Sequence, residues 1–392
     1  MKLLRTLLAL VGVAQLFVSG CSSHPSLRPG RTTVSGPSVT VPAEVLGNHF
    51  VVEGKWDKHG PWHFLIDTGS SVTLVSPEFA KRYATDRAAF DVPPVRVKSS
   101  NGDSSLLPAV TVRRISLKGA RFDNVQALIR DLSDLSNHLG VKIDAILGFP
   151  LFRETVFTMD YPNSKLVITS PQWRLDMRGS KVKFNNSQRT PLIPIHLGDV
   201  TMIALIDSGS DGPLSLNPFG LDLHYAVPPR PGSAVGTLSG NREQEIARLA
   251  DPLEIGSYRF EEPIADLTDQ LSSIGGEVLR NFAVTFDQPR NLVIFSRDDS
   301  APIRTPSRRS VGMAFLKGPT YWRVVDVVPG SPAAAAGIKE GDLVTRINGE
   351  TIANWPLQRF EPFVKRNAEV VFTFLDGSKE KPVVIPVFDL VP

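Results

Sequence analysis

The chain carries one short motif twice, each time directly after an apolar run. Phe64-Leu65-Ile66 leads into Asp67-Thr68-Gly69-Ser70, and Ala204-Leu205-Ile206 leads into Asp207-Ser208-Gly209-Ser210. An apolar run that ends in Asp, a small hydroxyl residue and Gly is typical of a buried strand followed by a tight turn. The duplication therefore predicts two similar strand-and-turn units, each with one aspartate at its end.

Further segments repeat behind each motif. Gly148 and Gly275 each follow an apolar segment, and Asp160 and Asp287 each end a Thr-apolar-Asp triplet. Both pairs are separated by 127 residues, which is longer than the unit of any solenoid. The pattern predicts two lobes of related fold rather than a repeat array.

On these motifs the chain resembles the aspartic peptidases, from about residue 38 to residue 297. Lobes of roughly 130 residues are shorter than those of pepsin and more similar to retropepsin lobes, here fused into one chain. A retropepsin must dimerise to gain its second aspartate, whereas this chain carries both. The resemblance implies a mainly β, bilobal pepsin-like fold.

The resemblance also implies roles for the motif residues. Asp67 and Asp207 would be the general base and general acid, without an assignment of which is which. Thr68 and Ser208 would hydrogen-bond across to the opposite lobe. Ser70 and Ser210 would hold the outer carboxylate oxygens.

Water can hydrolyse a peptide bond when one carboxylate accepts its proton and a neighbouring carboxylic acid donates to the carbonyl. Two carboxyl groups about 3 Å apart cannot both ionise, so they share a proton, as the pepsin dyad illustrates. Gly69 and Gly209 allow the tight turns and the close approach that this arrangement needs. The chemistry requires no cofactor and no metal.

The two copies differ in the residue after the motif. Asp211 stands where the first copy has Ser71. This carboxylate could raise the apparent pKa of the dyad or face solvent, and the following Gly212 and Pro213 favour a solvent-facing turn.

Hairpins that could cover the site are less evident, and neither candidate carries a clear flap tyrosine. Asn101-Gly102 predicts a hairpin between the 95–97 and 110–112 runs, since Asn-Gly is the strongest two-residue hairpin signal. In the second lobe only the glycine-rich segment 232–240 is a candidate.

The N-terminus indicates a lipoprotein. Lys2 and Arg5 precede a mostly apolar stretch, too short to span a bilayer, that ends in Val18-Ser19-Gly20-Cys21 and resembles a bacterial lipobox. Cys21 is the only cysteine, so no intramolecular disulfide can form. Lipidation of Cys21 is the simplest explanation, and an incidental cysteine in a cleaved leader is the alternative. Ser22 after it predicts a bacterial envelope protein anchored at the outer membrane and facing the periplasm.

Composition agrees with a β-rich globular protein. The chain is 42% hydrophobic and 21% charged, with 32 Pro and 30 Gly in 392 residues.

The basic residues and histidines do not predict a nucleic-acid or metal site. The net charge of +3 is mild, and Arg304, Arg308 and Arg309 lie among Pro and Ser, which indicates a solvated linker rather than a nucleic-acid site. His59 and His63 flank a Gly-Pro turn and not a helix, so no metal site is predicted.

The last 80 or so residues carry helix and turn signals of their own. Ser331, Pro332 and Gly337 delimit a short helix, and Asn348-Gly349 predicts a hairpin. In the order of these elements the segment resembles a bacterial PDZ domain. Gly312-Met313-Ala314-Phe315 would match the carboxylate-binding loop, with Ala314 where that loop usually has a second Gly. The segment 357–366 would be the groove helix, interrupted or started by Pro362.

The predicted organisation is a signal peptide at 1–21, a tether at 22–38, lobes at 39–171 and 172–297, a linker at 298–310 and a PDZ domain at 311–392. The predicted function is that of a membrane-anchored aspartic endopeptidase whose PDZ domain, on a flexible linker, recruits the C-termini of peptide or protein substrates. Two alternatives stay open: an inactive peptide-binding scaffold of the envelope, and a hydrolase of other bonds, which no Ser/His/Asp set supports. A PDZ domain used only for packing is a further alternative.

Overall fold

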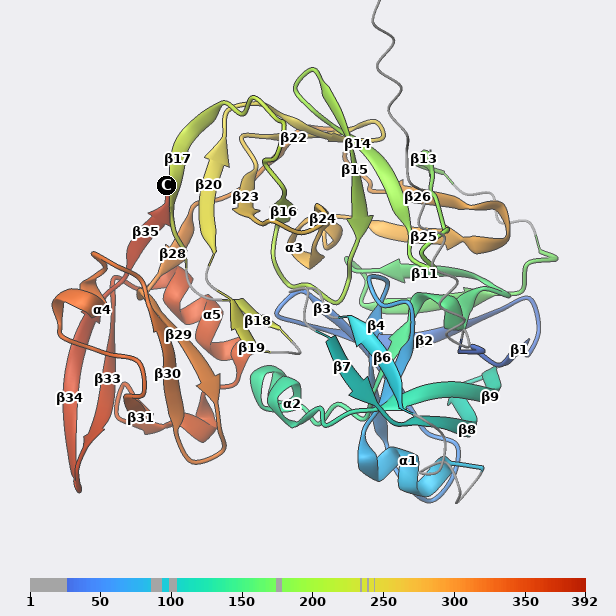
Figure 1. Ribbon diagram of the computed structural model, residues 1–392, viewed down its shortest axis with the longest axis horizontal. Coiled ribbons are helices and arrows are strands. Elements are labelled where there is room, and N and C mark those ends of the chain that lie inside the picture. The colour runs from blue at the N-terminus through green and yellow to red at the C-terminus, as the bar shows by residue number, and fades with distance from the viewer. Residues whose placement is uncertain are drawn as a thin grey trace, which may run out of the picture.

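The computed structural model describes residues 27–85, 94–98, 104–173, 178–232, 235–237, 240–242 and 244–392, and Figure 1 shows a mainly β molecule with a C-terminal domain at one side. The predicted signal peptide, with Cys21, lies outside these residues. Within the described ranges no helix is long and apolar enough to cross a bilayer.

The first lobe is built from twelve strands and two α-helices. Their bounds are β1 Arg31–Val34, β2 Ser38–Leu46, β3 His49–Gly54, β4 Trp62–Asp67, β5 Thr73–Val75, α1 Pro77–Tyr83, β6 Val95–Lys98, β7 Ser104–Leu107, β8 Ala109–Leu117, β9 Ala120–Ile129, α2 Ser133–Leu139, β10 Ala145–Gly148, β11 Val156–Asp160 and β12 Lys165–Thr169.

The second lobe repeats this pattern with more short strands. Its elements are β13 Ser180–Lys183, β14 Leu192–Leu197, β15 Val200–Ile206, β16 Leu214–Leu216, β17 Tyr225–Pro231, β18 Val235–Thr237, β19 Gly240–Arg242, β20 Glu245–Leu249, β21 Leu253–Ile255, β22 Tyr258–Glu261, β23 Ile264–Leu267, β24 Ser273–Ile274, α3 Gly276–Leu279, β25 Ala283–Asp287 and β26 Leu292–Ser296.

The two lobes share one sheet. Strand β11 pairs antiparallel with β25, which joins β12, β11, β25 and β26 into a continuous run. In that pairing Thr158 lies opposite Thr285, its counterpart in the 127-residue repeat, and the two hydroxyl oxygens are 2.8 Å apart. Equivalent residues that face each other in this way lie on a local twofold axis. The sheet therefore ties the lobes together symmetrically.

A single large core supports both lobes. It includes the residues that precede each motif, among them Phe64, Ile66, Ala204 and Ile206, all at most 1% exposed. Burial of such apolar strands contributes roughly 25 cal/mol per Å² of apolar surface. The aspartates thus stand at the ends of strands that the core holds rigidly.

The C-terminal domain has a sheet of its own, in the order β29-β30-β31-β33-β34 with β32 beside β31. The elements from residue 303 onward are β27 Ile303–Arg304, β28 Arg308–Ser310, β29 Met313–Lys317, β30 Trp322–Val327, α4 Pro332–Ala335, β31 Leu343–Ile347, β32 Glu350–Thr351, α5 Leu357–Arg366, β33 Glu369–Asp376, β34 Lys379–Pro386 and β35 Phe388–Val391.

Local signals in this domain are confirmed by the structure. The Ser331 hydroxyl accepts from the Ala334 N–H and caps α4. Asn348 and Gly349 have φ of 49° and 79°, as a type I′ hairpin turn requires. Pro362 neither interrupts nor starts α5, which runs continuously from Leu357 to Arg366.

Two boundaries differ from the sequence prediction. The segment 31–34 of the predicted tether forms β1, paired antiparallel with β9. The predicted linker is not a solvated tether, because β27 pairs with β22 and β28 pairs with β35. Arg308 in this segment forms an ion pair of 2.7 Å with Glu277 of the second lobe. These pairings are long-range and leave no local pattern, so composition alone suggested a linker.

Candidate active site

Each motif is held by the same strand arrangement. In the first lobe β10 runs parallel to β4 and antiparallel to β5, which places Gly148 beside Asp67. In the second lobe β24 is likewise parallel to β15 and antiparallel to β16, and the Asp207 N–H donates to the Ile274 carbonyl. The two aspartates therefore occupy equivalent positions in the repeat.

Hydrogen bonds cross between the two motifs in both directions. The Thr68 N–H donates to the Ser208 hydroxyl at 3.0 Å, and the Ser208 N–H donates to the Thr68 hydroxyl at 3.0 Å. The two hydroxyls in turn donate to the Ile206 and Ile66 carbonyls, at 2.7 and 2.8 Å. Thr68 and Ser208 are buried, so these are the cross-lobe hydrogen bonds that the sequence predicted. They fix the two motif turns against each other.

The glycines of the motifs let the carboxyl groups approach. A Cβ on Gly69 would lie 2.3 Å from Asp207 Oδ1, and one on Gly209 would lie 2.5 Å from Asp67 Cγ. No real side chain tolerates such contacts, so only glycine fits at both positions. The carboxyl groups of Asp67 and Asp207 hydrogen-bond to each other.

The environment favours a proton on this pair. Burial, followed by the negative charge of Asp207, raises the pKa of Asp67 to about 8, against the lowering effect of the Ser70 and Gly69 N–H groups. Burial also raises the pKa of Asp207, while the Gly209 N–H and His49 oppose it. Because the groups interact strongly, the shared proton belongs to the pair. Burial and the proximity of the two carboxyl groups therefore favour retention of a proton by the pair.

The serines that follow the glycines have a different role from the one expected. The backbone N–H of Ser70 donates to Asp67 Oδ1 at 3.0 Å, whereas its hydroxyl donates to the Val72 carbonyl at 2.8 Å. The Ser210 hydroxyl accepts from the Gly212 N–H at 3.3 Å. These hydroxyls shape the turn after each motif, because the backbone there is sharply bent and its polar groups need nearby partners.

Asp211 lies at the rim of the site. Its side chain is 39% exposed, and its Oδ2 is 3.9 Å from His138 Nε2 on α2. Burial raises the pKa of this carboxyl, but the nearby His138 and the charge of His49 outweigh that effect and hold it well below its usual range. Asp211 is therefore ionised, with His138 of the first lobe beside it.

Two buried side chains near the dyad were not predicted. His49 is 5% exposed, and its Nε2 lies 3.2 Å from the Gly209 carbonyl. Tyr161 is 4% exposed and packs edge-on against Phe50, and burial together with the charges of Asp207 and Asp67 raises its pKa. A single His or Tyr within an apolar stretch belongs to no motif or periodic pattern in the sequence. Only the fold therefore shows that these two side chains lie near the aspartate pair.

The two predicted hairpins exist in part. Strand β6 pairs with β7, at 104–107, and not with the 110–112 run, which belongs to β8 and pairs with β9. The Asn101-Gly102 turn lies outside the described residues. In the second lobe β18 pairs with β19 within the predicted 232–240 segment and just beyond it.

The predicted carboxylate-binding loop also differs in detail. Gly312 has φ of 78° and turns the chain, whereas Met313, Ala314 and Phe315 already belong to β29. Ala314 pairs with Asp326 in the strand, a position that does not need glycine. The Gly312 N–H donates to the Ser310 hydroxyl at 2.9 Å.

Among the described residues no three His, Cys, Asp or Glu side chains are grouped as metal ligands would be.

Comparison with known families finds two matches that agree with this architecture. Residues 52–151 match the family model for aspartyl proteases, a range that contains Asp67 and Gly148. Residues 323–374 match the family model for PDZ domains. The fold is accordingly mainly β, with an aspartyl protease-like domain followed by a PDZ domain.

Individual similar proteins match only part of the chain. Human rhophilin-1 is 38% identical over 77 residues, which are 20% of this chain and 10% of rhophilin-1. A PDZ domain protein from Parabacteroides distasonis is 20% identical over 21% of both chains, with a TM-score of 0.19. The HtrA3 PDZ domain bound to a phage-derived ligand is 17% identical over 21% of this chain and 88% of its own, also with a TM-score of 0.19.

Proposed function

We propose that the protein is an aspartic endopeptidase with Asp67 and Asp207 as its catalytic dyad. The observation that carries this proposal is the pair of hydrogen-bonded carboxyl groups, locked by the reciprocal bonds of Thr68 and Ser208. An ionised carboxylate in the pair accepts a proton from water, and the protonated partner donates to the carbonyl oxygen of the scissile bond. The water oxygen bonds to the carbonyl carbon, which gives a geminal diol and leaves one proton on the pair. When the diol collapses, the C–N bond breaks, the pair gives its proton to the leaving amine nitrogen, and one diol hydroxyl returns a proton to the pair, which regains its starting state.

The rigid setting of the pair supports catalysis as well as structure. The motif turns cannot separate without breaking four buried hydrogen bonds. Preorganised groups need no reorganisation as charge develops in the transition state. An extended peptide that adds to strand edges near the dyad is the substrate that such β-rich surroundings suit.

The test uses the chain from residue 22 onward, purified without its leader and incubated with a diverse peptide mixture. Cleavage should be blocked by pepstatin and by Asp67→Asn, whereas Asp123→Asn, the same change at a surface carboxylate paired with Arg114, should retain it. Loss of cleavage in the control variant, or cleavage that survives Asp67→Asn, would contradict the proposal. Peptide binding without cleavage by the unaltered chain would instead identify an inactive scaffold.

We further propose that Cys21 carries a lipid anchor and that the domain after residue 311 binds substrate or partner C-termini. The support is the lipobox-like Val18-Ser19-Gly20-Cys21 sequence and the match of residues 323–374 to PDZ domains. Cys21→Ala should move the protein from the membrane fraction to the soluble fraction of an expressing bacterium. An unchanged membrane fraction would reject the anchor.

A further inference from the structure

The turn between β2 and β3 of the first lobe reaches across to the second motif. Gly47 and Asn48 have φ of 53° and 73°, so the chain reverses tightly there. The Asn48 side chain donates from Nδ2 to the Asp211 carbonyl at 2.7 Å and accepts at Oδ1 from Arg280 at 2.9 Å. A Cβ on Gly276 would lie 2.4 Å from the Asn48 carbonyl oxygen, so glycine is needed for this approach. The turn therefore contacts both the second motif and α3.

His49, the next residue, holds the motif turn itself. Its side chain is buried, and its Nε2 lies 3.2 Å from the Gly209 carbonyl. Because a carbonyl oxygen can only accept, Nε2 is the donor of this hydrogen bond. The N–H of the same glycine donates to Asp207 Oδ1 at 3.0 Å. His49 is thus linked to the Asp207 carboxyl group through a single residue.

The first motif has no equivalent contact. The segment 185–191 leads into β14, which pairs antiparallel with the motif strand β15 as β3 pairs with β4. This segment is therefore the counterpart of the turn before β3. It contains no histidine, and within the part of the chain that the structure describes no hydrogen bond joins it to residues 67–70. The two motifs repeat, but they are not held equally.

Charge distinguishes the two aspartates in the same sense. Burial raises the pKa of Asp207, while the Gly209 N–H and then the charge of His49 lower it. Burial and the charge of Asp207 raise the pKa of Asp67, and the groups that oppose them are backbone N–H groups. The hydrogen bond between the two carboxyl groups also raises the pKa of Asp67 and lowers that of Asp207. A proton on the pair is therefore more stable on Asp67.

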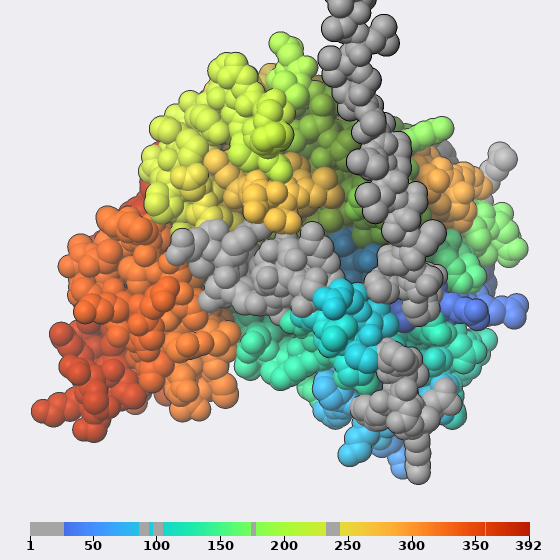
Figure 2. All heavy atoms as spheres, in the orientation of Figure 1, coloured from blue at the N-terminus to red at the C-terminus, as the bar shows by residue number. Residues whose placement is uncertain are grey.

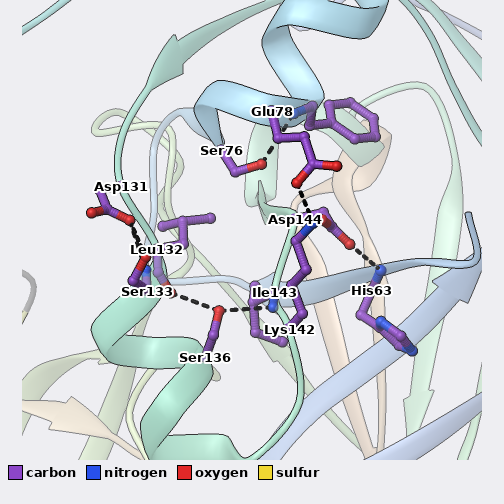
Figure 3. A network of polar contacts seen from close by, with 11 residues as sticks. His63, Ser76, Glu78, Asp131, Leu132, Ser133, Ser136, Lys142, Ile143 and Asp144 are labelled. Atoms are coloured by element: carbon purple, nitrogen blue, oxygen red, sulfur yellow. Dashed lines mark hydrogen bonds and ion pairs between the residues drawn. The ribbon is translucent and has the colours of Figure 1, made fainter. Parts of the chain in front are cut away.

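A second histidine of the first lobe lies near the motif but beside a different carboxyl group. His138, on α2, has its Nε2 3.9 Å from Asp211 Oδ2. Helix α2 is held by the Ser136 hydroxyl, which accepts from the Ile143 N–H in Figure 3, and by Gln358 of the PDZ domain, which donates to the carbonyl of the last helical residue. Figure 2 shows this domain beside the first lobe. Other titratable groups that interact with Asp211 or with the pair are Tyr161, Asp266, Arg308, Lys317 and Glu361.

We propose that Asn48 and His49 are positioning residues that make the two aspartates unequal. Asp207 is then the ionised base, and Asp67 is the protonated acid that donates to the carbonyl of the substrate. Asn48 fixes where the second motif turn lies, and His49 adds a hydrogen bond and a positive charge on the Asp207 side. The roles of base and acid rest on the proposed function, whereas the inequality of the two carboxyl groups does not depend on cleavage.

Two changes at His49 separate its hydrogen bond from its charge. His49→Gln keeps an N–H donor for the Gly209 carbonyl and removes the charge, and His49→Leu removes both. The dependence of kcat/KM on pH is measured on the chain from residue 22 onward with a peptide from the substrate screen. His49→Gln should move the acid limb upward by about 1 pH unit, because the base loses the cation that favours its ionised form. It should keep most of kcat at its optimum, whereas His49→Leu should also lower kcat about 10- to 100-fold through the misplaced turn.

Two further variants serve as comparisons. Asn48→Gly removes the amide and keeps the positive φ without strain, so it should lower kcat and leave the acid limb in place. His196→Gln makes the same change at an exposed histidine of β14, whose Nδ1 is 2.9 Å from the Thr201 hydroxyl. That variant should change neither kcat nor the limb. A merely structural role of His49 would lower kcat or stability without moving the limb.

A measurement without substrate makes the result independent of peptidase activity. Carbon-13 labelling of the aspartate carboxyl carbons lets NMR follow each group with pH, with signals assigned by Asp67→Asn and Asp207→Asn. Asp207 should ionise at lower pH than Asp67, and His49→Gln should raise the Asp207 step by about 1 pH unit. The proposal is overturned if Asp67 ionises first, or if His49→Gln moves the Asp207 step no more than His196→Gln does. Unequal steps of the expected kind in a chain that cleaves no peptide would reject the proposed peptidase and leave this inference standing.

Discussion

At the scale of single residues, the proposed function depends on a proton shared by two carboxyl groups. Asp67 and Asp207 hydrogen-bond to each other at a position that only glycine neighbours permit. In the proposed mechanism, loss of either partner removes both the general base and the general acid, because each role needs the other carboxyl group. Residues that act as a unit show strongly non-additive effects.

We therefore predict that Asp67→Asn and Asp207→Asn each reduce kcat at least about a thousandfold, and that the double variant is hardly worse than either single one. The fold should persist, since an amide can keep the hydrogen bonds of the pair. Steady-state cleavage of a peptide found in the substrate screen measures the effect. Substantial turnover by either single variant would refute the two-aspartate mechanism.

The raised pKa of Asp67 gives a second prediction, on pH. A carboxyl group with a folded-state pKa near 8 holds a proton that the unfolded chain releases near pH 4, so stability falls as pH rises between these values. The Asp67→Asn variant has no carboxyl proton to release at this position, so its stability should not fall for this reason as the pH rises. Its melting temperature should exceed that of the unaltered chain by a margin that grows from pH 4 to pH 8.

The same pKa sets the alkaline limb of the activity profile. The shared proton should be lost toward pH 8, which gives a bell-shaped profile reaching above the acid range expected from the resemblance alone. Asp211→Ser should leave this limb in place, because Asp211 lies beside His138 and its pKa depends on His138 and on the charge of His49. A shift of the limb in that variant would show that Asp211 acts on the dyad.

At the scale of elements, the two motif turns behave as one structural unit. Thr68 and Ser208 make four buried hydrogen bonds to the opposite motif, two of them to each other and two to the Ile206 and Ile66 carbonyls. The repeated motif, with its apolar strand and its closing Gly148 or Gly275, was sufficient to predict two similar turns, and the resemblance to aspartic peptidases implied the hydrogen bonds between them. The helix α4 and the Asn348-Gly349 hairpin were predictable for the same reason, because their signals are local.

We predict that Ser208→Ala lowers the stability of the protein by about 1–3 kcal/mol, since it leaves the Thr68 N–H and the Ile66 carbonyl buried without partners. Activity per folded molecule should also fall, because the turns are less well fixed. Chemical denaturation and peptide cleavage measure the two effects. Ser187→Ala, at an exposed turn, is the control, and equal losses in both variants would contradict the prediction.

At the scale of the whole molecule, the PDZ domain is part of the folded body and not a tethered module. Leu390 and Val391 of β35, with Val328, pack against Ile246 and Ile264 of the second lobe. The sequence could not predict this contact, because its residues are far apart in the chain and short polar strands such as β27 and β28 gain their partners only in the fold. The expectation of a flexible linker was wrong for this reason.

Arg248 is the side chain that fastens this junction. It is 7% exposed, and its guanidinium donates to the carbonyls of Glu262, Thr305, Pro306 and Pro392. A planar group with five donors can join several chain segments at once, which lysine cannot. Three segments, the second lobe, the 303–310 stretch and the C-terminal strand, are thereby held by one residue.

We predict that Arg248→Met, which keeps the stem and removes the guanidinium, frees the 303–310 stretch. Four part-buried carbonyls would lose a donor, and water can replace it at the exposed residues among them, so stability should fall by about 1–3 kcal/mol in all. Trypsin should then cut at Arg304, Arg308 or Arg309 at a concentration that leaves the unaltered chain intact. Arg259→Met, at an exposed arginine of the same lobe, should not change the cleavage pattern. If the Arg248→Met chain resisted trypsin as well as the unaltered chain, the prediction would be wrong. The apolar contacts of β35 would then be sufficient to hold the PDZ domain. In that case only deletion of residues 311–392, and not loss of one side chain, would expose Ile246 and Ile264.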